Sequence, residues 1–138
     1  MEAQDTISKA HQLHLQAQQR YIRINAHIKV YGTRNAETEQ LARNGIEFVE
    51  AALKLVPDSP AFLNTYALLV TDGLGDTKLG LEILQRAAQL TPDDIQLRQN
   101  IRDIQAGGRV PHINSVGIIV IALIIAVGII LIAIYAYR

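Results

Sequence analysis

The chain has 138 residues, no cysteine, and equal numbers of basic and acidic side chains, 13 of each. The absence of cysteine excludes disulfides, thiolate zinc sites and cysteine nucleophiles. Residues 1–35 carry a net charge of +3 and residues 36–110 one of −4. Neither imbalance is the clustered basic face typical of nucleic-acid-binding proteins, so we expect no nucleic-acid partner.

The pattern of apolar residues, caps and breakers along residues 1–107 predicts an all-α domain without strands. Gly32, Pro92 and the Gly107-Gly108 pair are the expected helix stops. We expect a first helix from Asp5 or Thr6 to about Tyr31, a second from the N-cap Asn35 to Val56, a third from Pro60 to near Asp72, a fourth from the cap Asp76 to just before Pro92, and a fifth opened by Asp93 or Asp94.

Apolar and half-polar residues recur at heptad spacing along the first of these helices, and apolar residues also recur along the fifth. In the fifth helix, they would cover the last hairpin. The set in the first helix is Ile7, Ala10, His14, Ala17, Tyr21, Ile24, Ile28 and Tyr31, and the set in the fifth is Ile95, Leu97, Ile101 and Ile104.

Two segments, residues 44–60 and 79–95, align with a constant offset of 35 residues. A repeat of this period indicates stacked helical hairpins, because each hairpin alone cannot bury its apolar face. The matched residues are Gly45, Val49, Ala52, Leu55 and Pro57 in the first segment and Gly80, Leu84, Ala87, Leu90 and Pro92 in the second.

This spacing resembles the second helix of a tetratricopeptide repeat, and Gly75-Asp76 occupies the usual turn position. The consensus of the first helix survives only as apolar character, and the opening helix of the first repeat has a different register. The resemblance covers roughly residues 21–105 and implies a protein-binding concave face lined by the first helices of the hairpins. On this basis the expected protein-binding residues are Phe62, Thr65, Tyr66, Leu69, Tyr31 and Arg34, with His27, Val30 and Asp72 beside them. The alternative is that Tyr66 and Leu69 are core residues.

Residues 116–137 contain no charged residue and no proline. As a helix these 22 residues would be about 33 Å long, enough to cross a hydrocarbon core of about 30 Å. We therefore divide the chain into a helical domain (1–107), a juxtamembrane linker (108–115) and a transmembrane helix (116–137). Basic residues lie mainly before the span, and residues 1–23 contain no secretory signal. This pattern predicts a C-terminal anchor with the N-terminal domain in the cytoplasm.

Small residues in the predicted span fall on two separate faces of the helix, and such faces let transmembrane helices approach closely. The expected packing residues are Ala122, Ala126, Ala133 and Ala136 on one face and Gly117 and Gly128 on the other. The alternative is that these residues need no partner.

No motif in the chain indicates catalysis, a cofactor or a small-molecule substrate. His11 and His14 are three residues apart on one helix, but a zinc or iron site needs three or four ligands and no third one lies near in sequence. The segment Asp72–Asp76 lacks the lysine and serine or threonine of a phosphate-binding loop. We therefore expect neither a metal site nor an enzyme.

Two functions fit these observations. The first is a non-catalytic, membrane-anchored scaffold or accessory subunit that binds other, mainly integral membrane, protein subunits through both the helical domain and the span. The second is a recruitment adaptor for a soluble cytosolic partner, similar in layout to the mitochondrial fission adaptors. The bilayer is an expected partner in both cases.

Overall fold

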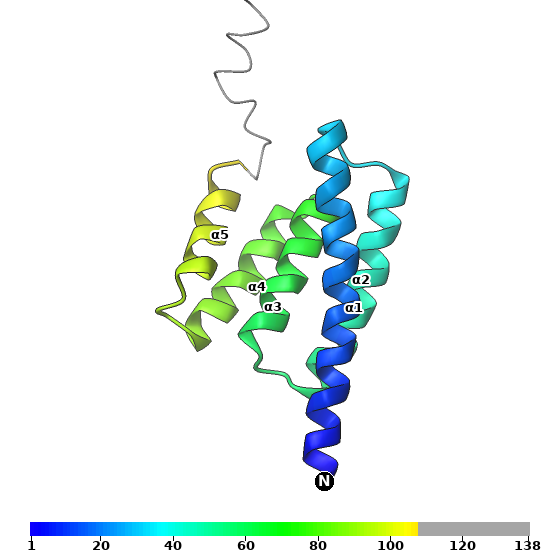
Figure 1. Cartoon of the computed structure of the whole chain (residues 1–138). Helices are drawn as coiled ribbons and strands as arrows, with labels where there is room; N and C mark the ends of the chain where they lie inside the picture. The colour runs from blue at the N-terminus through cyan, green and yellow to red at the C-terminus, as the bar shows by residue number, and fades with distance from the viewer. Residues whose placement is uncertain (108–138) are drawn as a thin grey trace, which may run out of the picture.

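The computed structural model describes residues 1–107, which form an array of helices without strands (Figure 1). The prediction of an all-α domain with five helices is confirmed for this part of the chain. The elements are α1 (Glu2–Tyr31), α2 (Ala36–Leu55), α3 (Pro60–Leu68), the π-helical segment η1 (Leu69–Leu74), α4 (Thr77–Leu90) and α5 (Ile95–Gln105).

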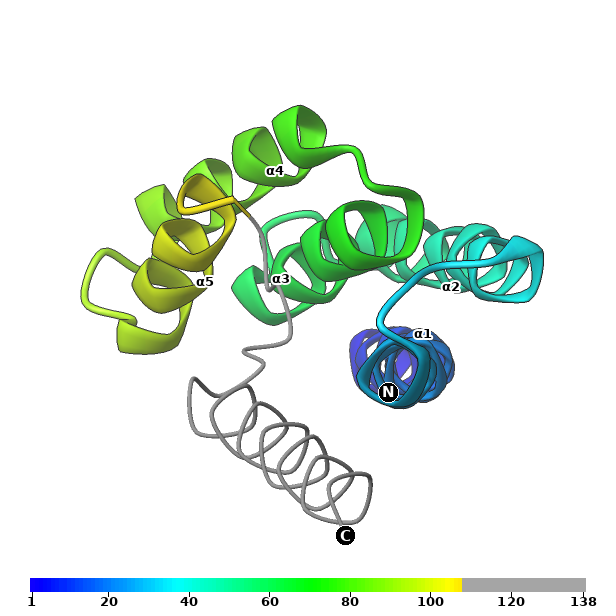
Figure 2. The same ribbon diagram turned by 90° about the horizontal axis from the view of Figure 1, so that it is seen from above.

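Consecutive helices pack side by side as hairpins, α1 with α2 and α3 with α4, and α5 packs against α4. In the view from above, α1, α3 and α5 lie along one side of the array and α2 and α4 along the other (Figure 2). We call the first of these sides the α1/α3/α5 face. The arrangement is compatible with a helical repeat fold, in which each hairpin buries its apolar side against its neighbour.

Local sequence signals set most of the helix ends. Gly32 adopts the left-handed conformation, with φ of 72°, and ends α1. Asn35 and Thr38 form a capping box at the start of α2. The side chains of Asp76 and Asp94 accept hydrogen bonds from the backbone N–H groups of Leu79 and Leu97 at the starts of α4 and α5. Asn35, Asp76 and Asp94 are caps that the sequence predicts, because Asn and Asp satisfy backbone donors that have no partner within the helix.

Two predicted helix boundaries are wrong. The first helix begins at Glu2 rather than at Asp5 or Thr6, and Thr6 donates its hydroxyl hydrogen to the carbonyl oxygen of Glu2 inside the helix. The third helix stops being α-helical after Leu68, but the chain continues as a π-helix to Leu74. Polar residues at a helix start can thus lie within its first turn, where their side chains bond to the backbone of that turn.

The 35-residue repeat appears as equivalent buried positions in α2 and α4. Gly45 and Gly80, Val49 and Leu84, and Ala52 and Ala87 are all buried. The same offset continues beyond the segments found in the sequence. It relates the N-caps Ser59 and Asp94, and it relates three buried residues of α3 and η1 to three of α5: Phe62 to Leu97, Thr65 to Asn100, and Leu69 to Ile104.

The core has two clusters, and α3 contributes to both. One cluster joins α1, α2, α3 and η1 through residues such as Ile24, Val49 and Phe62. The other joins α3, η1, α4 and α5 through residues such as Leu63, Leu84 and Leu97. Because α3 and η1 have core residues on two sides, their packing holds the two hairpins together.

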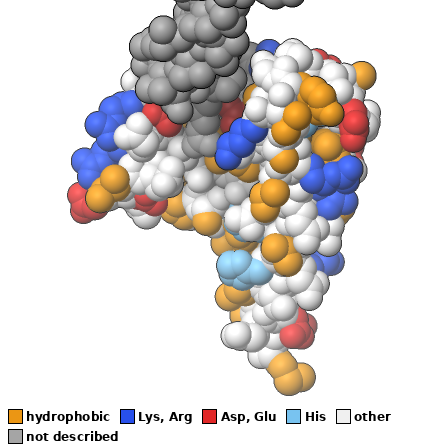
Figure 3. Space-filling view, turned by 45° about the horizontal axis from the view of Figure 1, so that its top comes forward, with side chains coloured by type: hydrophobic (Ala, Val, Ile, Leu, Met, Phe, Trp, Pro, Cys, Tyr) orange, Lys and Arg blue, Asp and Glu red, His pale blue; other side chains and the backbone are white. Residues whose placement is uncertain are grey.

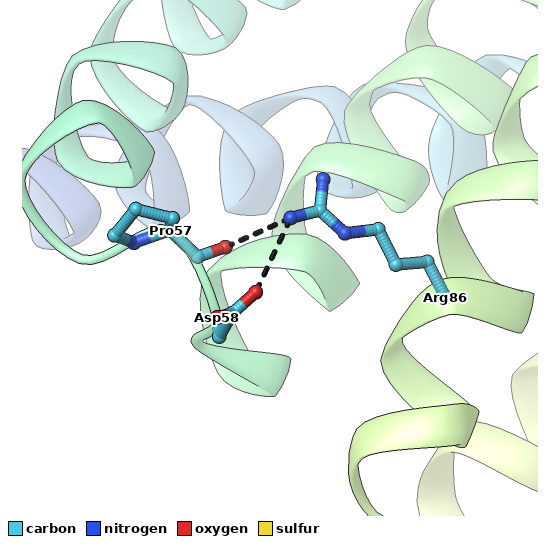
Figure 4. A network of polar contacts seen from close by, with 3 residues as sticks. All are labelled: Pro57, Asp58 and Arg86. Atoms are coloured by element: carbon cyan, nitrogen blue, oxygen red, sulfur yellow. Dashed lines mark hydrogen bonds and ion pairs between the residues drawn. The ribbon is translucent and has the colours of Figure 1, made fainter.

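A polar contact on the surface also connects the hairpins. The guanidinium group of Arg86 in α4 donates to the carbonyl oxygen of Pro57 at 3.3 Å and to the carboxylate of Asp58 at 3.4 Å (Figure 4). Both acceptors lie in the turn between α2 and α3. Exposed ion pairs of this kind add little stability, typically below about 1 kcal/mol, so packing of the core remains the main source of the hairpin arrangement.

Candidate binding surface

Three of the residues predicted to line an open binding face are core residues. Phe62, Thr65 and Leu69 are buried in the structure. The ring of Phe62 lies 5.6 Å from that of His11 and 4.6 Å from that of His14, centroid to centroid. The sequence-based assignment of these residues to an open surface is therefore wrong. Phe62 and Thr65 lie against His14 of α1, and Leu69 of η1 packs against Gly45 of α2.

Tyr66 is partly buried and its side chain is directed toward α2. Its hydroxyl group donates to the carboxylate of Glu50 at 2.8 Å. Burial, together with this hydrogen bond and the negative charge of Glu50, raises the pKa of Tyr66 to about 12. Tyr66 therefore remains protonated at neutral pH and acts as a hydrogen-bond donor between α3 and α2.

Tyr31 and Arg34 lie near the end of α1, far from Phe62. Tyr31 is 69% exposed, and its ring lies 4.6 Å from that of His27. Arg34 is exposed in the following loop, and its guanidinium group lies beside Gly75, within 2.6 Å of the place where a Cβ atom would be. Tyr31 is 17 residues along the same helix from His14, a distance of about 25 Å. The structure thus does not gather the six predicted residues into one site.

Not all of the heptad-spaced residues of the first helix are buried. Ile7 and Tyr31 are exposed. Ile95 of α5 is exposed as well. Between the two ends of α1, Leu15 and Ile22 are also exposed, and neither belongs to the heptad-spaced set. The spacing of eight residues from Ile7 to Leu15 and of seven from Leu15 to Ile22 is the signal that could have revealed a second apolar face.

His14 forms a buried polar contact between α1 and α3. Its Nε2 atom lies 2.7 Å from the hydroxyl oxygen of Thr65. Burial, and to a smaller extent the neighbouring His11, lowers the pKa of His14. Among residues 1–107 no group of three or more His, Cys, Asp or Glu side chains is placed to hold a metal ion. The role that the geometry gives His14 is a hydrogen bond within the core.

We expect the stability of the helical domain to fall as the pH drops below about 6.5, the ordinary pKa of histidine. The pKa of His14 is lower in the folded state than in the unfolded state, so the unfolded chain binds more protons in this range. The contribution from His14 is present above the unfolded pKa and is lost as the pH falls toward the folded pKa. Urea unfolding of the full chain in mild detergent at pH 7.5 and pH 5.5 measures the effect. The His14→Gln variant should lose part of this pH dependence, and an unchanged pH dependence would contradict the assignment.

No helix within residues 1–107 is long and apolar enough to cross a membrane. The predicted span at 116–137 and the linker at 108–115 lie outside the described residues. So do the predicted packing residues Gly117, Ala122, Ala126, Gly128, Ala133 and Ala136. These assignments stay predictions from the sequence.

Comparison of the chain with known protein families, with curated proteins and with solved structures found no match.

Proposed function

We propose that this chain is a membrane-anchored, non-catalytic scaffold or accessory subunit that binds other membrane protein subunits. Its helical domain would act as a tetratricopeptide-like module and residues 116–137 as a C-terminal span. The observation that carries the proposal is the uncharged run of 22 residues that follows the helical domain. The 35-residue equivalence of buried positions in α2 and α4 and in α3 and α5 supports a helical repeat, a class of fold that serves mainly for binding.

The anchor is tested by alkaline carbonate extraction of membranes from cells that express the full chain. We expect the chain to stay in the membrane pellet. An arginine near the centre of a transmembrane helix costs about 2.5–3.5 kcal/mol, so the double variant Ile125→Arg/Val127→Arg should move to the soluble fraction. The matched control Ile125→Ala/Val127→Ala should stay in the pellet. Extraction of the unchanged chain by carbonate would contradict the proposed anchor.

The role as a subunit is tested by crosslinking mass spectrometry on intact membranes. We expect crosslinks from both the helical domain and the span to the same partner proteins. Replacing residues 116–137 by an unrelated span of the same length should then abolish the association. If the association survives the replacement, the span is only a tether and the chain is a recruitment adaptor for a soluble partner.

A further inference from the structure

A row of large apolar side chains is exposed along α1. Ile7, Leu15 and Ile22 are 47%, 53% and 64% exposed. At 3.6 residues per turn the three side chains fall in a sector about 80° wide. Figure 3 shows hydrophobic side chains following this helix on the face in view. The three side chains of this strip are two helical turns apart on one side of α1, and large apolar residues that share one exposed side of a helix can form an interaction surface.

The same sector of α1 carries no charge between Ile7 and Ile22. The residues that share it are His11 and Gln18. The charged residues of this part of the helix, Lys9, Arg20 and Arg23, fall roughly on the opposite side. A surface without charge favours an occupant without charge, because a charged occupant would lose water without gaining a partner.

This strip borders the α1/α3/α5 face. His11, which lies in the sector, contacts Phe62 of α3. Asn100 of α5 donates a hydrogen bond of 2.8 Å to the side-chain oxygen of Asn64 in α3, so α3 and α5 are also in contact. The strip is therefore at one side of a face that continues across α3 to α5 (Figure 2).

The chain itself supplies an uncharged segment that can reach this strip. Residues 108–115 join the end of α5 to the uncharged run 116–137. Eight extended residues span up to about 26–29 Å. Two helix-to-helix spacings, from α5 over α3 to α1, amount to about 16–20 Å. Because α5 and α1 end at the same end of the array (Figure 1), a segment that turns back from α5 would run along α1.

We propose that residues 116–137, before they enter a membrane, bind to the α1/α3/α5 face of their own chain against Ile7, Leu15 and Ile22. Binding removes apolar surface of both segments from water, and transfer into a bilayer then exposes the face for other proteins. The release step depends on the proposed function as a membrane anchor. The docking step does not, because it concerns the chain in water.

The absence of cysteine from the chain allows a direct test by disulfide crosslinking. Leu15→Cys is combined in the full chain with single cysteines at residues 124–127, which cover one helical turn and so every side of the segment. The variants are synthesised without membranes and oxidised, and crosslinks within one chain are separated from crosslinks between chains by gel mobility. The matched control places the first cysteine at Glu47, an exposed residue of α2.

We expect an intramolecular crosslink from Leu15→Cys to at least one of the four positions, several-fold stronger than from Glu47→Cys. Its yield should not depend on chain concentration, because tethering fixes the effective concentration of the two groups. Addition of lipid vesicles before oxidation should abolish it. Equal crosslinking of the control, no crosslink at any position, or crosslinks only between two chains would each overturn the docking. A crosslink that persists in vesicles, with a chain that carbonate extracts, would overturn the anchor and its release while supporting the docking.

Discussion

Replacing Phe62 by alanine should lower the free energy of unfolding of the helical domain by about 3–5 kcal/mol. Phe62 is only 2% exposed, and its ring contacts both His11 and His14. The substitution removes the largest fully buried side chain at the junction of α1 and α3 and leaves a cavity. Thermal unfolding of the full chain in mild detergent, followed by circular dichroism, measures the effect.

Leu15→Ala is the matched control, since Leu15 is a large apolar residue of α1 with its side chain exposed. We expect it to change the free energy of unfolding by less than about 0.5 kcal/mol. If Phe62→Ala is equally mild, Phe62 lies on an accessible surface, as the tetratricopeptide resemblance implies, and α1 does not pack on α3 at this point.

The features that the sequence predicts correctly depend on residues close together in the chain. The N-cap Asn35 directly precedes the helix that it caps, and the left-handed Gly32 directly follows the helix that it ends. The repeat is also a local pattern, copied once at a distance of 35 residues. Gly45 and Gly80 are buried at equivalent points of α2 and α4 for this reason.

The features that the sequence does not predict depend on which helix lies against which. The burial of Thr65 follows from its contact with His14, which is 51 residues away in the chain. Ile7 and Ile24 are both apolar and in phase with the same heptads, yet one is exposed and the other buried. Nothing in the spacing along α1 says where its partner helices end, so the assignment of its two faces needs the structure.

The difference between local patterns and helix packing also affects the prediction of the binding face. Tetratricopeptide resemblance places a binding face on the first helices of the hairpins, but it says nothing of how closely α1 covers α3. The structure moves the exposed apolar surface from Phe62 and Leu69 to Leu15 and Ile22 of α1. The candidate surface is thus still on the first helices, but on different residues.

Gly73→Ala should destabilise the helical domain by about 1–3 kcal/mol, the usual cost of an added methyl group in a closely packed site. A Cβ atom at Gly73 would clash with the Cβ atom of Ala42 in α2. The backbone of Gly73 does not have a positive φ, so alanine fits its conformation and the clash is the main cost. For a domain of this size, each kcal/mol corresponds to a fall in the melting temperature of roughly 4–8 °C.

A second substitution at the contact separates the clash from other effects of alanine at position 73. Ala42→Gly alone should lower the free energy of unfolding by about 1 kcal/mol through its helix propensity. Combined with Gly73→Ala, it removes the Cβ atom of Ala42 and with it the clash. The double variant should therefore be more stable than the sum of the two single effects, with a coupling of about 1 kcal/mol or more. Ala52→Gly makes the same change ten residues further along α2. Its effect on the free energy of unfolding should simply add to that of Gly73→Ala. Simple additivity for both pairs would show that η1 does not pack against α2 at Gly73. The coupling thus tests whether the π-helical segment, which no sequence signal predicts, joins the second hairpin to the first.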